Sequence, residues 1–311
     1  MGRCSAGLPR ITRSHVLLVA TAFCMSFILV HAQALKALGV SSFEQVLLRL
    51  AIALPIMLLV FRGAGLRDLR RRDIPLFLLL GLVFSFFLLS AISAVALGLP
   101  IPVAVALVYT QPIFTAVISV ARRSEEPTLL GALAIALGVS GAFLATGLTL
   151  EELAALEFSP GLISGFLSGF LYASYLAAKR EARERGYRPE QVTCLTFALS
   201  LLVLLLLYVP FSSAFPDPRL AALSMPGPLQ SALLLSFAVV STAMPYAFLN
   251  AVEPGEVSPL SEGLLLLLDP ALHVLWAFLL FGQTVSGWQY LGVALIIASS
   301  ALSTLARARD K

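Results

Sequence analysis

The chain has 311 residues, of which 59% are hydrophobic and 12% are charged, and its mean hydropathy is +0.94. A soluble domain carries about 25% charged residues, so this composition excludes an ordinary soluble fold and indicates a protein that is dissolved in lipid. The net charge of +4 would suit a nucleic-acid-binding protein. However, the basic residues form short clusters at the ends of apolar runs, which is typical of membrane topology.

Long, continuous apolar runs follow one another along the whole chain, and runs of this kind predict helices rather than half-buried strands. A helix also pairs its own backbone N–H and C=O groups, which lipid requires. At about 20 residues per crossing, ten such helices leave no room for a soluble domain. We therefore predict an all-α membrane protein with ten transmembrane helices, at residues 14–36, 43–61, 73–97, 101–121, 128–147, 160–180, 190–211, 229–252, 257–281 and 285–306.

The first run has one alternative interpretation, because Val30-His31-Ala32 after a basic start resembles a signal-peptidase site. Apolar character continues to Leu38, and removal of the segment would leave an odd number of helices, so we expect that it is retained. The three cysteines, Cys4, Cys24 and Cys194, lack metal-ligand or disulfide spacing, so we predict neither a metal nor a cofactor.

The distribution of Lys and Arg predicts the orientation. With both termini in the cytoplasm, 18 of the 21 basic residues lie in cytoplasmic connections or at the chain ends. The exceptions are Lys36 and Arg219, which lie outside, and Arg49, which lies within a helix. This bias follows the positive-inside rule and supports an even number of helices.

The two halves of the chain, 14–147 and 160–306, resemble each other. Glu44-Gln45-Val46 opens the second helix and Glu190-Gln191-Val192 the seventh, while Gln111-Pro112 and Asp269-Pro270 interrupt the fourth and the ninth. A repeat of five helices re-enters the membrane from the opposite side, and the charge bias of corresponding loops is inverted accordingly. The pattern predicts two inverted five-helix repeats, an architecture common in secondary transporters.

The paired segments Val103 to Leu107 with Gln111-Pro112, and Leu264 to Leu268 with Asp269-Pro270, resemble the drug/metabolite transporter superfamily in its EamA-type ten-helix branch. The resemblance covers nearly the whole chain, with one departure: Gln283 stands where that family usually has Glu. It implies export, or less often uptake, of amino acids and related small metabolites at the inner membrane, without ATP hydrolysis.

Polar residues at membrane depth are costly and therefore mark candidate binding sites. Glu262, Asp269 and His273 lie on one face of the ninth predicted helix, because their helical offsets are only about 20° and 40°. Gln111 and Thr115 form the matching stripe of the fourth, so we expect the two helices to face each other across a cavity. Asp269 or Glu262 would take up a proton or bind a substrate amine; alternatively, Glu262 caps or snorkels and Asp269 is paired structurally.

The other candidate substrate-binding residues lie on other helices. Arg49 would hold a substrate carboxylate, or instead snorkel to the interface or pair with Glu44. Aromatic rings with a polar tip suit an amphipathic or cationic metabolite. The remaining candidates are His31, Tyr109, Tyr246, Asn250 and Trp276.

Two patterns in the sixth predicted helix are interpreted as structural. Tyr172 and Tyr175 lie close to a basic loop, so we assign them to an interfacial aromatic belt. Gly161, Gly165 and Gly169 recur every four residues, a spacing that allows two helices to pack closely.

The expected partners are a small-molecule substrate, coupled protons and the lipid bilayer, with no nucleic acid, in a monomer or homodimer. An intramembrane protease is the rival class, because Gly138-Val139-Ser140-Gly141 is similar to the serine motif of rhomboid-type proteases. A channel is a further rival, but nothing in the sequence indicates a selectivity filter. A non-enzymatic carrier fits the repeat best.

Overall fold

The computed structural model describes residues 11–63, 69–99, 101–124, 126–147, 151, 158–281 and 286–309, and it contains no strand in these ranges. The first half comprises α1 (Arg13–Met25), α2 (Ile28–Ala37), α3 (Ser42–Val60), η2 (Arg71–Asp73), α4 (Ile74–Ala96), α5 (Ile101–Val108), α6 (Gln111–Ala121) and α7 (Leu129–Ala145). The second half comprises α9 (Pro160–Glu184), α10 (Pro189–Ala214), α11 (Pro218–Ala221), α12 (Pro228–Ala238), η3 (Val239–Ala243), α13 (Met244–Asn250), α14 (Pro259–Leu265), α15 (Leu268–Phe281) and α16 (Gly287–Arg309).

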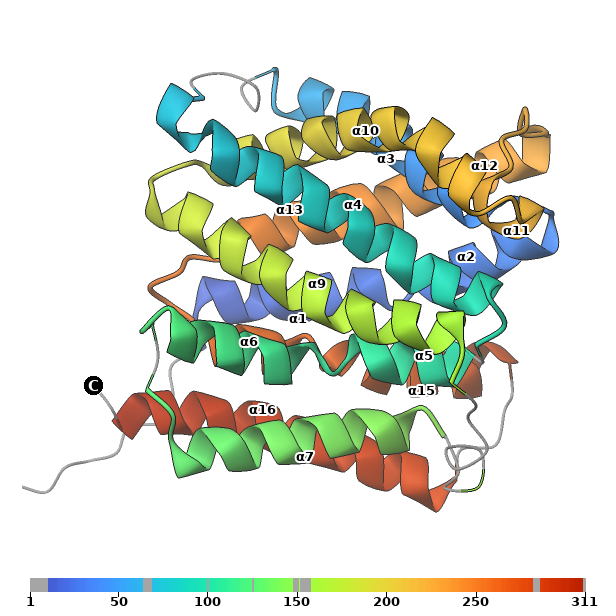
Figure 1. Cartoon of the computed structure of the whole chain (residues 1–311). Coiled ribbons are helices and arrows are strands. Elements are labelled where there is room, and N and C mark those ends of the chain that lie inside the picture. The colour runs from blue at the N-terminus through green and yellow to red at the C-terminus, as the bar shows by residue number, and fades with distance from the viewer. Residues whose placement is uncertain are drawn as a thin grey trace, which may run out of the picture.

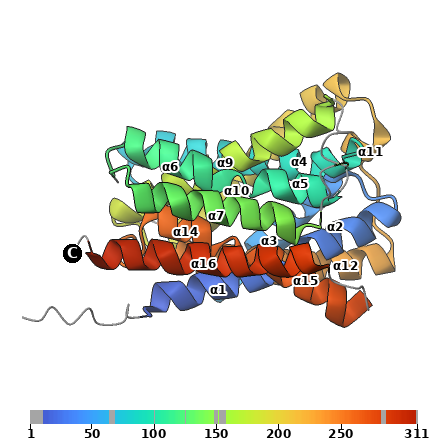
Figure 2. The same ribbon diagram turned by 90° about the horizontal axis from the view of Figure 1, so that it is seen from below.

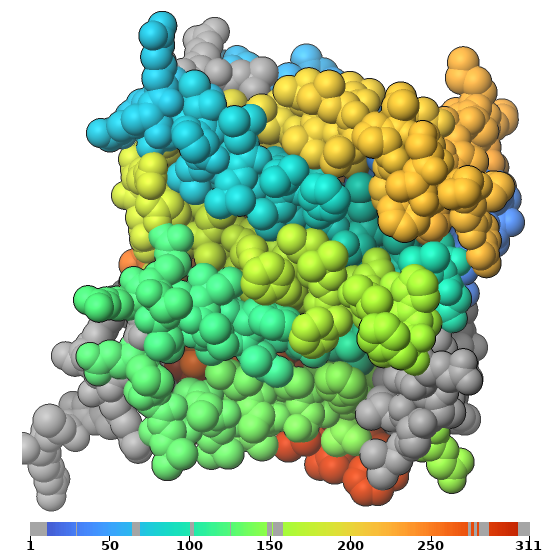
Figure 3. All heavy atoms as spheres, in the orientation of Figure 1, coloured from blue at the N-terminus to red at the C-terminus, as the bar shows by residue number. Residues whose placement is uncertain are grey.

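Seven helical stretches of the described residues are long and apolar enough to cross a membrane: Arg13–Ala37, Ser42–Val60, Arg71–Ala96, Val103–Ala121, Pro160–Glu184, Pro189–Ala214 and Pro228–Asn250. Leu129–Ala145 and Gly287–Ser303 are shorter apolar helices. Large apolar side chains on the outside of the bundle, such as Leu59 and Leu206, are 79% and 70% exposed. Figure 3 shows one face of the molecule, on which neighbouring helices pack closely against one another. An apolar exterior of this kind suits lipid.

Several of the predicted helices are interrupted. The first breaks between α1 and α2, the fourth at Tyr109-Thr110, and the ninth at Leu266-Leu267. The eighth passes through η3, a π-helical turn between α12 and α13. Proline follows three of these irregularities, at Pro112, Pro245 and Pro270. Proline is tolerated in a first turn because its missing N–H would have no partner there.

The helices lie side by side in a bundle in which distant parts of the sequence meet. Helix α4 packs along α9 and α10, and α7 packs along α16 at one edge of the molecule (Figures 1 and 2). The α9 glycines are contact sites, as predicted: a β-carbon on Gly161 would lie 3.1 Å from the Ala94 carbonyl, and one on Gly169 would lie 2.7 Å from the Leu107 carbonyl.

The tightest helix contact joins α7 and α16. A β-carbon on Gly141 would lie 2.8 Å from the Gly292 carbonyl, and one on Gly292 would lie 2.6 Å from the Gly141 carbonyl. Both neighbours are backbone atoms, so the helices themselves would have to separate. Ser140 of the protease-like motif is exposed on the opposite side of α7, and its neighbouring glycines serve packing.

We predict that Gly292→Ala lowers the free energy of unfolding by about 1–3 kcal/mol, because the added methyl overpacks the contact between α7 and α16. Gly287→Ala is the matched control: it lies in the same helix, and its β-carbon would meet nothing within 4 Å. Unfolding of the two variants in detergent, followed by circular dichroism, makes the comparison. Equal stability of the two variants would contradict the close contact.

Candidate functional site

A cavity of about 170 Å³ runs into the bundle from one end. Its lining includes the exposed residues Lys36, Gly39 and Arg219 at what we call the open end, and the buried residues Tyr246 and Asp269 at its depth. Helices of both halves contribute to it: α1 to α5 from the first, and α9, α11, α13 and α15 from the second. A mostly apolar pocket with a few convergent polar groups is typical of a small-molecule site.

Asp269 is the carboxylate of this cavity. It lies in the first turn of α15, where the helix dipole favours a negative charge, and it is 7% exposed. The hydroxyl of Tyr109, at the break between α5 and α6, donates a hydrogen bond to it. The interrupted fourth and ninth helices thus bring a phenol and a carboxylate together.

Aromatic rings form much of the wall around Asp269. Tyr172 stacks on Phe87 with ring centroids 4.6 Å apart, and Tyr246 meets Phe84 edge-on at 4.7 Å. Tyr172 and Tyr175 are 3% and 0% exposed. Our assignment of these two tyrosines to an interfacial belt is therefore wrong: they lie inside the bundle, and Tyr172 lines the cavity. Their closeness to basic residues along the chain hid the face on which they lie.

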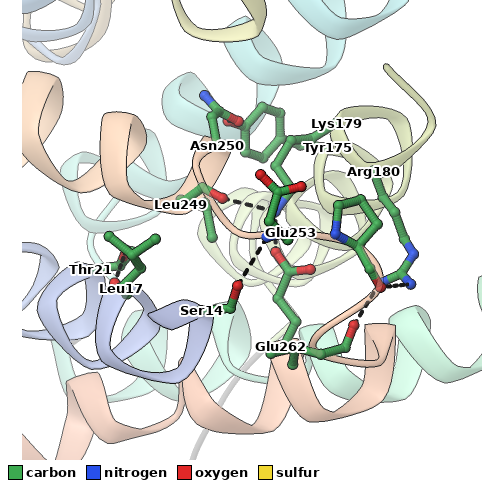
Figure 4. Close-up of polar contacts among 12 residues, drawn as sticks. Ser14, Leu17, Thr21, Tyr175, Lys179, Arg180, Leu249, Asn250, Glu253 and Glu262 are labelled. Carbon is green, nitrogen blue, oxygen red and sulfur yellow. Dashed lines mark hydrogen bonds and ion pairs between the residues drawn. The ribbon is translucent and has the colours of Figure 1, made fainter. Parts of the chain in front are cut away.

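A second, smaller cavity of about 30 Å³ is lined by Thr115, Arg122, Glu181 and Glu262. We call the buried ion pair of Lys179 and Glu262, with its hydrogen-bond partner Leu249, the wall. Lys179 of α9 forms an ion pair with Glu262 of α14, and both side chains are almost completely buried. The Lys179 ammonium also donates to the Leu249 carbonyl at 3.1 Å. Figure 4 shows how these groups converge from three helices.

The wall is fastened on the side away from the cavity. Arg180 donates to the carbonyls of Pro254, at 2.6 Å, and of Val257, at 3.0 Å. Ser14, at the start of α1, accepts from the Glu253 N–H at 3.0 Å (Figure 4). The Ser14 N–H donates to Glu256, also at 3.0 Å. Hydrogen bonds from the Ser14 hydroxyl and backbone N–H hold the pKa of Glu256 below its usual range. Helices α1 and α9 are thus both tied to the connection between α13 and α14.

The structure brings some predicted residues together and separates others. Gln111 donates to the Gly263 carbonyl at 2.8 Å and accepts from Thr115 at 2.9 Å, so the predicted fourth and ninth helices do face each other. Glu262 and Asp269, predicted on one helical face, line different cavities because the helix breaks between them. The side chain of His273 and all of Gln283 lie outside the described residues.

Other candidates make contacts beside the cavity. Asn250 accepts from the Tyr175 hydroxyl at 3.1 Å and donates to Thr193 at 2.9 Å. Trp276 donates to Ser26 at 2.7 Å, which joins α15 to the end of α1. Neither Asn250 nor Trp276 lines the cavity. In the structure, these two side chains connect neighbouring helices.

Arg49 and His31 lie in a separate buried cluster. The Arg49 guanidinium sits 4.7 Å from the ring centre of Phe237, and His31 stacks on the same ring at 5.4 Å. The His31 imidazole also contacts Ser236 and Ser241, at 2.9 and 3.2 Å. Glu44 accepts from Ser224 instead of pairing with Arg49, so that alternative is wrong.

In the sequence analysis, no role in the site was assigned to several polar residues, among them Gln45 and Lys179. Gln45 lines the cavity but was used there only as a marker of the repeat. Lys179 was counted with the basic loop that follows it. The signal for Lys179 is its spacing: Tyr172, Tyr175 and Lys179 lie at i, i+3 and i+7 of one helix, and therefore on one face.

The model of the EamA-like transporter family matches residues 12–147 and again residues 159–305. The chain belongs to the EamA-like transporter family. It is 30% identical to an uncharacterized transporter of Archaeoglobus fulgidus over 75% of this chain and 77% of that one. It is 28% identical to the threonine/homoserine exporter RhtA of Salmonella typhimurium LT2 (85% and 82% covered) and of Escherichia coli K12 (83% and 80%).

A solved crystal structure shares the fold, with a TM-score of 0.75 at 16% identity, and covers 96% of this chain and 98% of that one. Membership of the family confirms the sequence-based assignment to the drug/metabolite transporter superfamily. The protein is a multi-pass transporter of the inner membrane, and it is not an enzyme.

The buried ion pair yields a test by double substitution. We predict that Lys179→Met or Glu262→Leu alone lowers the free energy of unfolding by about 3–5 kcal/mol, because each leaves the other charge buried and unpaired. The double variant should lose less than either single variant. Denaturation of all four proteins in detergent measures the cycle; additive losses would show that the two groups do not interact.

Proposed function

We propose that this protein is a secondary transporter that exports amino acids or related small metabolites by alternating access. The observation that carries the proposal is a cavity that opens at one end of the bundle and has the buried residues Tyr246 and Asp269 at its depth. The buried Lys179–Glu262 ion pair is not part of its lining and lies toward the other end of the bundle. A continuous pore would suit a channel, whereas a cavity with a closed end suits a carrier. The relatives named threonine/homoserine exporters support amino acids as the substrate class.

The proposed topology has ten crossings, both termini in the cytoplasm and two inverted halves. Helices α14 and α15 together form the ninth crossing, and α16 forms the tenth. The distribution of basic residues supports this orientation, and two successive matches of the family model support the two halves. In this orientation the open end faces outward, and the Lys179–Glu262 wall closes the cytoplasmic side.

Asp269 is the proposed coupling residue of the cavity. Its carboxylate and the Tyr109 hydroxyl form a unit that takes up a proton or holds the ammonium group of a substrate. Glu262, already paired with Lys179, serves the wall instead. Export then requires the wall to open toward the cytoplasm and the open end to close.

A second candidate is uptake of organic solutes or organic cations. Aromatic rings around a carboxylate attract a cation by the ring quadrupole as well as by charge. Tyr109, Tyr172 and Tyr246 with Asp269 form such a surrounding. The two candidates differ in direction and in the need for a carboxylate on the substrate.

We expect purified protein in liposomes loaded with unlabelled L-threonine to accumulate labelled L-threonine by counterflow. Counterflow requires one binding site that is exposed to each side in turn, so a carrier shows it and a channel does not. Liposomes loaded with choline test the organic-cation alternative. Labelled threonine that equilibrates without accumulating would contradict a carrier mechanism.

We predict that Asp269→Asn reduces this counterflow about 10-fold or more, because a hydrogen bond to a charged group contributes about 1.5–3 kcal/mol. The amide can still accept from Tyr109, so the fold should be retained. Glu190→Gln is the control: Glu190 pairs with Arg188 at 3.5 Å, and neither residue lines the cavity. Full counterflow by the Asp269 variant at normal abundance would exclude binding of the substrate amine by Asp269.

A further inference from the structure

Arg49 is a buried cation for which the structure shows no anion. The side chain is 1% exposed and lies about 10 Å along α3 from its first residue, given a rise of about 1.5 Å per residue. Within the described part of the chain, no carboxylate pairs with it, and its Nε and Nη1 atoms have no hydrogen-bond partner. Its one close contact with an aromatic ring is with Phe237.

Such an arrangement is costly unless a ligand completes it. A buried charge without a partner loses its hydration. An unpaired buried donor likewise costs its full desolvation free energy. The cation–π contact with Phe237 offsets only part of that loss. Buried arginine presents a rigid fork of N–H donors, and this fork matches a carboxylate in two parallel hydrogen bonds.

The surroundings of Arg49 favour an acceptor ligand. Tyr246 is 0% exposed and lines the cavity, and its hydroxyl has no hydrogen-bond partner among the described residues. This hydroxyl lies within electrostatic range of both Arg49 and Asp269. Helix α3 also packs against η3, the π-helical turn that precedes Tyr246. π-Helical turns occur frequently at functional sites.

The cavity reaches the neighbourhood of Arg49 along its own helix. Gln45 lies one turn before Arg49, lines the cavity, and has an unpartnered side-chain oxygen. Arg49 therefore lies one helical turn beyond a residue that lines the cavity, and the Asp269 carboxylate lines the same cavity. We call these two charged groups the poles of the site. Tyr246 interacts electrostatically with both of them, and its hydroxyl can donate to an anion.

We propose that Arg49 and the Tyr246 hydroxyl bind the carboxylate of the substrate, so that the transporter selects zwitterionic amino acids over organic cations that lack a carboxylate. This assignment rests on the proposed function and deepens it. The amine of the zwitterion faces Asp269, and the carboxylate faces Arg49. Binding then neutralises both poles at once.

The test compares three probes by counterflow inhibition: L-threonine, L-threoninol, which lacks the carboxylate charge, and 2,3-dihydroxybutanoate, which lacks the amine. In the unsubstituted protein, loss of the carboxylate should weaken binding about 10-fold to 100-fold, as expected for a charged hydrogen-bonded pair. In Arg49→Met, the absence of the carboxylate from the ligand should weaken binding less than about 3-fold, because the protein no longer has the guanidinium that binds it.

Two further variants keep the test decisive. Arg49→Lys retains a charge without the fork, so it should show an intermediate preference for threonine over threoninol. Tyr246→Phe should reduce the preference for threonine over threoninol by a smaller factor than Arg49→Met does. If Arg49→Met does not fold, the comparison of Arg49→Lys with the unsubstituted protein still measures the change in preference.

The outcomes separate the two proposals. A protein that transports neither L-threonine nor other amino acids contradicts the proposed function. A protein that transports threonine, but in which the threoninol penalty is the same with and without Arg49, contradicts the role of Arg49 alone. Equal affinity of the unsubstituted protein for threonine and threoninol also overturns it.

Discussion

The structure depends on one constraint: in lipid, every backbone N–H and C=O group must find its partner within the protein. A helix can therefore break only where it faces the protein interior or a water-filled space. The breaks at Tyr109-Thr110 and near Leu266-Leu267 meet this condition, because residues beside both of them line the cavity. Irregular backbone and the candidate cavity therefore coincide, because a space inside the protein can satisfy the polar groups of both.

The breaks also decide which polar groups can meet. A continuous ninth helix would have kept Glu262 and Asp269 on one face, as its sequence suggests. The break instead leaves Glu262 opposite Lys179 and turns Asp269 toward Tyr109. One carboxylate therefore closes a wall, while the other remains in an aromatic cavity. The two acidic residues of one crossing have different environments and thus different chemistry.

Hydropathy and charge predict a large part of this fold. The predicted segments lie within a few residues of the helices because lipid thickness, chain length and turn residues fix them together. The breaks are harder to find, since a stretch such as Leu264 to Leu268 is uniformly apolar whether or not its backbone is regular. Hydropathy reports only that such a segment avoids water.

Only some residues of the candidate site stand out in the sequence, for a similar reason. Asp269 stands out because an acid within an apolar run is unusual. Lys179 does not stand out, because Arg180 and Arg183 follow it and the group resembles an ordinary basic loop. The same basic residues led to the wrong assignment of Tyr172 and Tyr175 to an interfacial belt. Only the three-dimensional partners Glu262 and Phe87 show that the face of α9 that carries these side chains points inward.

The buried charges also suggest how occupancy and conformation are linked. A buried ion pair contributes little to the net free energy of folding, because the Coulomb attraction and the cost of desolvation nearly cancel. A wall made from Lys179 and Glu262 can thus open to water at smaller cost than an apolar plug. The Arg49 guanidinium differs, because it is already buried without an anion while the cavity is open at one end. On the proposed assignment, a bound zwitterion supplies that anion, so substrate binding favours the conformation in which Arg49 contacts the carboxylate.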